Sequence, residues 1–407
     1  MIKFLSKVIL VAFISWLVLE GIAQLVWWGR SCVTLFGKNV CLLPEPLLTL
    51  EQREAIEDLK EARYHQFDPL LGWSIRPNSR VRNDDIIYAS NDIGIRSPRH
   101  FDRTPPPGVT RLAAFGPSFV HGDEVAYEST WEYHIERQRP DLEVMNWGVN
   151  GYGTDQAFLR YQTQGAAYAP HVVIIGFEEE SQLRNVNRFR PFYAFGTGIP
   201  LTKPMFVLDG DGLRLLSNPF SSLTQLAEKI RIDPNGFLDV VCPYDLFCDA
   251  ERYRTSPWDV IKSYRVLHTL AFELGRANGA PSIEQQAQRE ETIKQTSLRL
   301  VHLFVDTVRK NGSIPVLVMF PGRGTVERYQ KGQAPAYAEG VRLLQNQGIY
   351  VLDLAASFVE ANGPNLDFTH LFAPGGHYND AGNQVVSRAI INFLCQQQII
   401  GGCGTPK

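Results

Sequence analysis

After position 110, hydrophobic residues occur in short continuous runs. Longer amphipathic stretches separate these runs. The runs are Arg111–Gly116, Leu142–Trp147, His171–Phe177, Ile314–Phe320 and Tyr350–Leu354. The intervals between them are too long for hairpins, and continuous apolar runs are typical of parallel strands that are buried on both faces. The pattern therefore predicts a sheet of parallel strands.

Two stretches, one between the runs and one after the last of them, carry clear helix signals. Ser282 and Gln285 have the spacing of a capping box, and Asn311-Gly312 is a typical helix end. Between these ends the apolar residues repeat every three or four positions, and a second such pattern begins at about Asp380. Strands that alternate with helices predict a doubly wound α/β fold with layers of helices on a central sheet.

The N-terminal segment, residues 1–30, is apolar enough to enter a membrane. From Val8 to Trp28 the strongly polar residues are Glu20 and Gln24, and the run is about long enough to cross a bilayer as a helix. Lysines precede the run, so the positive-inside rule places the rest of the chain outside the cytoplasm, periplasmic or extracellular. The small residues Gly21–Ala23 leave a second interpretation open, a signal peptide that is removed so that the chain is secreted.

The remainder divides into a lead-in and an α/β domain. Residues 31–105 are rich in Pro, Arg and Asn and contain one predicted charged helix at Leu48–Tyr64. We interpret them as a segment that leads to the domain more than as part of its core. The domain covers residues 106–400. An insertion is predicted at about 193–280, where Asp209–Gly212 joins two apolar runs as a hairpin turn would.

Six cysteines fall into three close couples: Cys32 with Cys41, Cys242 with Cys248, and Cys395 with Cys403. Local disulfides are the simplest of the possible pairings, and they suit an oxidising compartment. No Cys-x-x-Cys spacing supports a zinc site, and we predict neither a metal nor a cofactor. The net charge of −3, without a basic stripe, argues against a nucleic-acid partner.

Residues that could carry chemistry follow the predicted strands, where open α/β sheets bind ligands. Ser118 follows the first strand, and the glycine-rich stretch Gly148–Gln156 follows the second. The acidic stretch Glu178–Ser181 follows the third, and His377 opens the last helix after two glycines. Taken singly, the serine reads as a helix cap and the histidine as structural. Together they are a candidate nucleophile and general base.

In their order and spacing, these stretches resemble the SGNH (GDSL-like) hydrolase family over about residues 66–396. The lead-in stretches Phe67–Trp73 and Asn91–Arg96 resemble its membrane-anchored members, and Gly148–Gln156 is the most specific match. The resemblance implies a three-layer α/β/α flavodoxin-like fold. It also implies that Ser118 is the nucleophile, that His377 is the base, and that the N–H groups of Ser118 and Gly151 form the oxyanion hole.

The sequence departs from the family pattern at three places. Pro117 stands where the Gly-Asp-Ser motif has its aspartate, and the third-block asparagine is replaced by Ser181 or Glu180. A serine hydroxyl could still donate to an oxyanion, whereas a glutamate would repel it. Pro374 occupies the position of the usual acid, so another carboxylate, of which Asp367 is near in sequence, or a backbone carbonyl is expected to orient His377.

We therefore expect an exported, membrane-anchored serine esterase that removes or transfers a small acyl group such as acetyl. The substrate would be an acylated small molecule or glycan, and the glycan follows from the resemblance only. The alternative is a catalytically inactive module of the same fold that binds carbohydrate or protein. A nucleotide-binding domain is disfavoured, because no Gly-x-Gly-x-x-Gly opens a helix after the first strand. The sequence predicts no oligomeric state.

Overall fold

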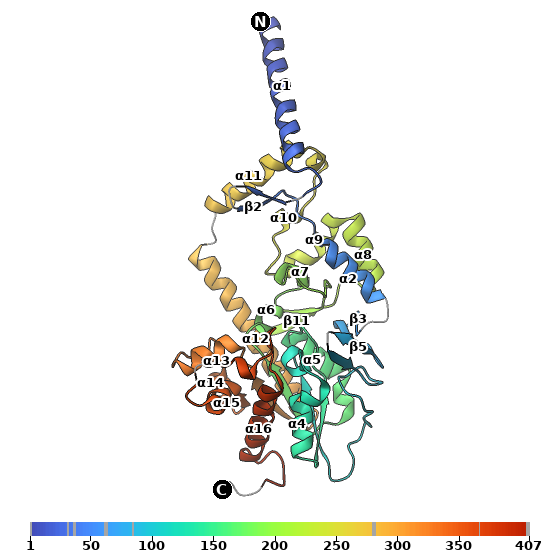
Figure 1. Ribbon diagram of the computed structural model, residues 1–407, viewed down its shortest axis with the longest axis vertical. Helices are drawn as coiled ribbons and strands as arrows, with labels where there is room; N and C mark the ends of the chain where they lie inside the picture. The colour runs from blue at the N-terminus through green and yellow to red at the C-terminus, as the bar shows by residue number, and fades with distance from the viewer. Residues whose placement is uncertain are drawn as a thin grey trace.

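The computed structural model describes residues 2–30, 32–35, 38–60, 64–83, 85–278, 282–365 and 367–403. The molecule is elongated, with helix α1 (Ile2–Val26) projecting from one end and an α/β domain at the other (Figure 1). Segments from the middle of the chain lie between the two.

The centre of the domain is a five-stranded parallel sheet in the order β13-β12-β9-β7-β8. Numbered along the chain, this is the 2-1-3-4-5 order of flavodoxin-like folds, so the predicted fold class is confirmed. Each predicted run matches a strand within one or two residues: β7 (Thr110–Phe115), β8 (Leu142–Asn146), β9 (Val172–Phe177), β12 (Ile314–Met319) and β13 (Tyr350–Asp353).

Helices cover both faces of the sheet, because successive strand residues point to opposite sides. One face packs against α5 (Thr154–Thr163), α12 (Ile283–Lys310) and α14 (Ala338–Asn346). The other packs against α4 (Trp131–Gln138), α13 (Arg323–Gln330), α15 (Leu354–Asn362) and α16 (Asp380–Gln396). The predicted capping box of α12 is present, with Ser282 and Gln285 each accepting the other's backbone N–H.

The lead-in contributes to the core, which corrects the expectation of a mere approach segment. Leu71 and Trp73 are buried in the same hydrophobic cluster as the sheet. Its elements are short hairpins, whose runs of four residues are too brief to give a clear sequence pattern. They are β1 (Cys32–Leu35) with β2 (Lys38–Cys41), β3 (His65–Asp68) with β4 (Gly72–Ile75), and β5 (Arg80–Asn83) with β6 (Ile86–Ala89). The predicted helix at 48–64 is α2 (Leu50–Lys60), and residues 61–63 lie outside the described residues.

The segment predicted as an insertion follows β9 and the short helices α6 (Ser181–Arg184) and α7 (Arg190–Tyr193). It contains the expected hairpin, β10 (Met205–Asp209) with β11 (Gly212–Leu216). Four helices follow: α8 (Leu223–Ile232), α9 (Pro234–Val241), α10 (Ala250–Tyr253) and α11 (Lys262–Asn278). Single 3₁₀ turns occur at Tyr127–Ser129, Gly165–Tyr168, Cys242–Tyr244, Pro257–Val260 and Thr369–Leu371.

The cysteines form the three local disulfides that the sequence predicts, Cys32–Cys41, Cys242–Cys248 and Cys395–Cys403. Helix α1 is long and apolar enough over Phe4–Val26 to cross a membrane, and few of its residues are buried against the rest of the chain. A signal sequence would have the same length and composition. Both features suit a chain that leaves the cytoplasm.

Candidate active site

Ser118 is the first residue of a short helix, α3 (Ser118–His121), that follows strand β7. Pro117 holds the cap position in an extended conformation, so the Ser118 hydroxyl is not used to cap the helix. Backbone N–H groups in the first turn of a helix have no acceptor within the helix. The loop therefore presents a hydroxyl beside backbone donors at the carboxyl edge of the sheet.

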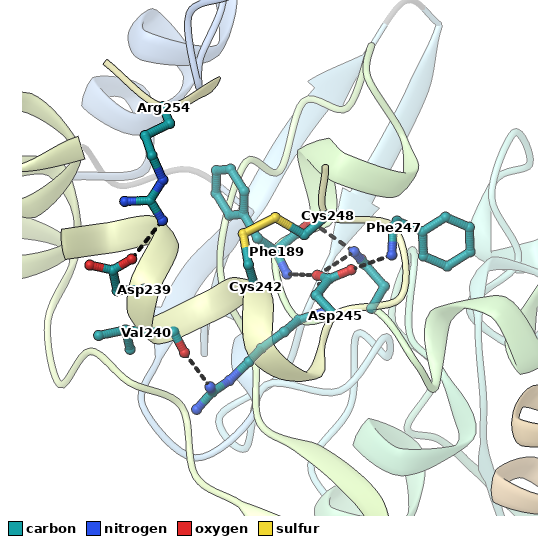
Figure 2. The surroundings of a disulfide bond; sticks show 10 residues. Phe189, Asp239, Val240, Cys242, Asp245, Phe247, Cys248 and Arg254 are labelled. Atoms are coloured by element: carbon teal, nitrogen blue, oxygen red, sulfur yellow. Dashed lines mark hydrogen bonds and ion pairs between the residues drawn. A yellow bond between two sulfur atoms is a disulfide. The ribbon is translucent and has the colours of Figure 1, made fainter. Parts of the chain in front are cut away.

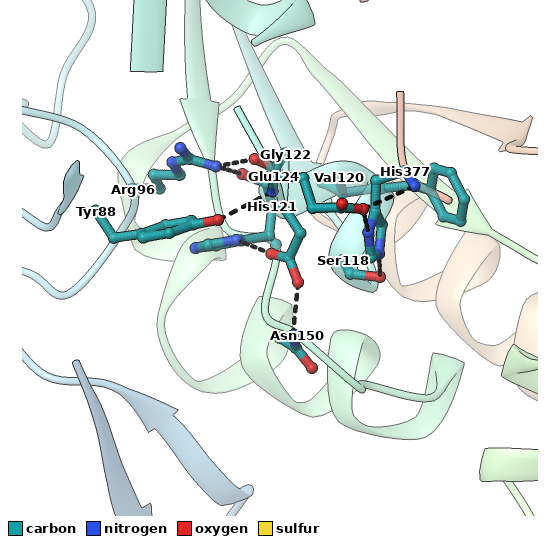
Figure 3. A network of polar contacts seen from close by, with 12 residues as sticks. Tyr88, Arg96, Ser118, Val120, His121, Gly122, Glu124, Asn150 and His377 are labelled. Atoms are coloured by element: carbon teal, nitrogen blue, oxygen red, sulfur yellow. Dashed lines mark hydrogen bonds and ion pairs between the residues drawn. The ribbon is translucent and has the colours of Figure 1, made fainter. Parts of the chain in front are cut away.

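The structure brings Ser118 and His377 together from opposite ends of the domain. The Ser118 Oγ lies 2.8 Å from His377 Nε2, and His377 Nδ1 lies 2.7 Å from Glu124 Oε2. Figure 3 shows the three side chains in one line, hydroxyl, imidazole and carboxylate. This is the arrangement in which an imidazole can take a proton from a hydroxyl while an acid orients it.

The carboxylate on His377 is Glu124, which the sequence did not suggest. Asp367 is exposed and accepts hydrogen bonds from the N–H and the hydroxyl of Thr369, so it does not orient the imidazole. A backbone carbonyl does not take that place either, because Nδ1 faces the Glu124 carboxylate. The available signal was the acidic pair Asp123-Glu124 in the loop of Ser118 itself.

Glu124 is held in an unusual backbone conformation. Its φ of 66° lies in the left-handed region, which is uncommon for residues other than glycine and asparagine. Its N–H donates to the Tyr88 hydroxyl at 2.9 Å, and its Oε1 accepts from the Gly375 N–H at 2.6 Å. A Cβ on Gly375 would lie 2.6 Å from Oε1, so a larger residue at this position would push the carboxylate away.

The contacts around Glu124 favour its ionised form. Burial raises the pKa of Glu124, but the N–H groups of His377 and Gly375 and the imidazole outweigh it and lower the pKa below its ordinary value. The carboxylate therefore stays charged at neutral pH, where it can stabilise an imidazolium on His377.

Arg96, from the lead-in, fixes the loop that carries Glu124. Its buried guanidinium donates to the carbonyl oxygens of His121 at 2.8 Å and Val125 at 2.5 Å, and also to that of Gly122. Figure 3 shows this guanidinium against the loop on the side away from His377. The lead-in therefore shapes the site without carrying the reacting groups.

A second buried polar chain runs beside the first. The Tyr64 hydroxyl lies 2.8 Å from His121 Nε2, His121 Nδ1 is hydrogen-bonded to Asp123, and Asn150 Nδ2 donates to Asp123 at 2.5 Å. Burial lowers the pKa of His121. Burial raises the pKa of Asp123, but the imidazoles of His121 and His377 and the Arg96 guanidinium together outweigh it, and the pKa falls to about 2. A neutral imidazole thus joins an ionised carboxylate, and Asn150 ties them to the loop of Gly151.

Gly151 lies against a guanidinium that the sequence did not single out. Arg190 Nη1 donates to the Gly151 carbonyl at 2.9 Å, and a Cβ on Gly151 would lie 2.5 Å from Nη1. Burial lowers the pKa of Arg190 to about 10, with the nearby Arg184 lowering it further. Among the described residues, no carboxylate forms an ion pair with Arg190. A guanidinium that the described residues leave without a direct ion pair therefore lies beside the glycine expected in the oxyanion hole.

Ser181, the weaker oxyanion candidate, is buried, and its hydroxyl accepts the Glu178 N–H at 3.3 Å. The described contacts do not join it to Ser118, His377 or Gly151. Glu178 and Glu180 both pair with Arg184, and the Arg184–Glu180 distance is 2.7 Å. The acidic stretch is thus largely neutralised, which limits the repulsion of an oxyanion that the sequence led us to expect.

The Cys242–Cys248 disulfide supports the segment before Arg190. Asp245, within the disulfide loop, accepts the N–H groups of Arg188 at 2.6 Å and Phe189 at 2.9 Å (Figure 2). The insertion therefore holds α7, and with it the guanidinium beside Gly151. No group of three metal-ligating side chains occurs in the part of the chain that the structure describes.

The sequence matches no protein-family model and no curated protein. Similar solved structures include a protein from Desulfitobacterium hafniense DCB-2 described as lipolytic and of the G-D-S-L family, 15% identical over 70% of this chain and 99% of that one, with a TM-score of 0.35. An acetyl xylan esterase is 13% identical over 69% and 98% of the two chains, with a TM-score of 0.36. A GDSL-like lipase from Bacteroides thetaiotaomicron VPI-5482 is 9% identical over 72% and 91%, with a TM-score of 0.34. These similarities are distant.

Proposed function

We propose that the chain is an exported serine esterase of the SGNH type, which removes or transfers a small acyl group such as acetyl. Its catalytic residues would be Ser118, His377 and Glu124. The observation that carries the proposal is the unbroken pair of hydrogen bonds from the Ser118 hydroxyl through His377 to Glu124. This geometry favours an enzyme over the inactive binding module, because a binding site has no need of a base aligned on a hydroxyl.

In the first half of the reaction, Ser118 Oγ attacks the ester carbonyl carbon while His377 Nε2 takes the hydroxyl proton. The bond from that carbon to the alcohol oxygen then breaks, and the proton passes from Nε2 to the departing alcohol. In the second half, water attacks the acyl-Ser118 ester with His377 again as base, and the acid leaves as Ser118 regains its proton. An acceptor alcohol in place of water would make the reaction an acyl transfer.

The oxyanion would be bound by the N–H groups of Ser118 and Gly151. Ser118 supplies the N–H of a first helical turn, and Arg190 places a positive charge beside Gly151. We propose that this charge offsets the loss of the third-block asparagine. A contribution from Ser181 stays a prediction, since its hydroxyl can donate while it accepts the Glu178 N–H.

The burial of Ser118 supports a small acyl group. The serine is 6% exposed, and the His377 side chain is 23% exposed, which suits an acetyl group on a larger, solvent-exposed alcohol. An acylated glycan is one such alcohol, and it is proposed on the family resemblance alone.

We also propose that α1 is retained as a membrane anchor with the domain outside the cytoplasm. The Glu20 carboxylate of α1 accepts the backbone N–H groups of Lys262 at 3.0 Å and Ser263 at 2.7 Å. Helix α1 therefore takes part in the fold, which favours retention over cleavage after Ala23.

The test is turnover of p-nitrophenyl acetate by the detergent-solubilised full chain and by its Ser118→Ala variant. Loss of the nucleophile is expected to lower kcat by about a thousandfold or more. Equal rates for the two proteins would overturn the esterase proposal and leave the binding module in its place.

A further inference from the structure

Helix α11 runs across the end of α1 (Figure 1). The two helices are joined where Glu20 accepts the first N–H groups of α11, at Lys262 and Ser263. Glu20 lies six residues before Val26, the last residue of α1, which is roughly 9 Å along the helix axis at 1.5 Å per residue. Helix α11 therefore begins beside the last turns of the apolar helix and not beyond its end.

One face of α11 packs on the body of the protein. The Arg265 guanidinium donates to the carbonyl oxygens of Leu42 at 2.9 Å and Leu43 at 2.7 Å. One turn later, the Thr269 hydroxyl accepts the Leu43 N–H at 3.0 Å. Leu42 and Leu43 are themselves buried. This face is therefore occupied by the segment that follows α1.

The opposite face of α11 is apolar and uncovered. With about 3.6 residues per turn, Leu267, Leu270 and Leu274 lie roughly opposite Arg265 and Thr269. These three leucines are 67%, 53% and 63% exposed. The 3₁₀ turn that precedes α11 exposes two more large apolar side chains, with Trp258 at 62% and Val260 at 81%. Large exposed apolar side chains gathered on one face of a helix mark an interaction surface.

We propose that this surface, Trp258, Val260, Leu267, Leu270 and Leu274, lies in the outer phospholipid leaflet beside α1. The inference rests on the proposed retention of α1 as an anchor. Interfacial helices lie in the membrane plane with their apolar face about 5–10 Å into the headgroup and acyl boundary, which is the depth at which Glu20 places α11. Tryptophans such as Trp258 are enriched at that boundary.

A phospholipid leaflet fits this surface better than a protein partner does. The surface adjoins the point where α1 would leave the bilayer, so any protein occupant would have to displace lipid that the anchor brings there. The second contact would limit tilting of the domain about α1 and hold the active site at a set height above the membrane.

The test is photocross-linking of the full chain in nanodiscs of phosphatidylglycerol and phosphatidylcholine. Single replacement of Leu267, Leu270 or Leu274 by p-benzoylphenylalanine is expected to give lipid adducts that mass spectrometry detects. Leu17, in the middle of α1 and 48% exposed, reports the anchor; Leu343, on α14 and 40% exposed, is the matched control away from the membrane. Adducts at the three α11 positions and at Leu17, with none at Leu343, would support the proposal.

Adducts at Leu17 with none on α11 would contradict the proposed lipid contact of α11 while supporting α1 as the anchor. Protein cross-links instead of lipid adducts on α11 would also overturn it, in favour of a protein partner or a second copy. Absence of lipid at Leu17 and on α11 would overturn the anchor and the surface together. Turnover of p-nitrophenyl acetate by the same preparations is measured separately, so failure of the esterase proposal is distinguishable from failure of this one.

Discussion

Glu124 and His377 are 253 residues apart in the chain, yet the Glu124 carboxylate lies 2.7 Å from the His377 imidazole. The acid therefore comes from the same loop as Ser118, and only the histidine comes from the far end of the domain. One turn of chain sets the relative positions of the hydroxyl and the carboxylate. Its shape depends on Arg96 and Tyr88 of the lead-in.

We expect Glu124→Gln to lower kcat by about a thousandfold to ten-thousandfold, because an amide cannot stabilise the imidazolium and favours the wrong tautomer. The measurement is steady-state turnover of p-nitrophenyl acetate. Asp367→Asn is the matched control, since it neutralises the acid that the sequence suggested for His377 without touching the site. It should leave kcat unchanged. A loss with Asp367→Asn and none with Glu124→Gln would contradict the assignment of the acid.

Removal of the charge beside Gly151 should slow the chemical step. We expect Arg190→Gln to lower kcat by about 10- to 100-fold, less than the hundred- to thousandfold cost of a lost direct oxyanion donor. Arg190→Lys keeps the charge but loses the planar fork that holds Gly151 and Thr197, so it should recover only part of the rate. Unchanged kcat with Arg190→Gln would exclude an electrostatic role for the guanidinium.

The Cys242–Cys248 disulfide should matter for activity as well as for stability. A double variant, Cys242→Ser with Cys248→Ser, is expected to lose about 2 kcal/mol of unfolding free energy and to lower kcat, because Asp245 then holds α7 less firmly. The matched variant, Cys395→Ser with Cys403→Ser, removes the disulfide at the opposite end of α16 from His377. It should lose similar stability while keeping its turnover rate. Chemical denaturation and steady-state kinetics measure the two effects, and equal turnover by the two variants would refute the link.

The lowered pKa of Asp123 predicts how the free energy of unfolding depends on pH. Its pKa is about 2 in the folded chain, below the ordinary value of 3.8, so the carboxylate stabilises the fold fully above pH 3.8 and loses this effect as pH falls toward 2. The difference in unfolding free energy between the unmodified chain and Asp123→Asn should follow that course. Denaturant titrations at a series of pH values measure it. A difference that grows as pH falls would have the wrong sign.

The sequence was sufficient for the sheet and the disulfides for physical reasons. Parallel strands buried on both faces leave continuous apolar runs such as Val172–Phe177, which no hairpin or surface helix imitates. Cysteines nine or fewer positions apart pair locally in all three cases. The lead-in was underestimated because hairpins with strands of four residues give almost no periodic signal.

The sequence was less sufficient for the site. Ser118 and His377 could be proposed from their order along the chain, since parallel strands end at one edge of the sheet. The acidic pair that contains Glu124 was visible beside Ser118, but its role was not, because the reach of Glu124 to His377 depends on a left-handed backbone at that residue. Arg190 could not be predicted for a similar reason. Its position beside Gly151 depends on Asp245, 55 positions later in the chain, which binds the backbone N–H groups of Arg188 and Phe189.

The most direct test of the central claim is to trap the acyl-enzyme. The full chain is mixed with p-nitrophenyl acetate, quenched in acid within the first turnover and digested for peptide mass spectrometry. We expect one acetyl group on Ser118 and none in the Ser118→Ala variant. An acetyl group on another residue, or none in a preparation that still turns over the ester, would contradict this expectation.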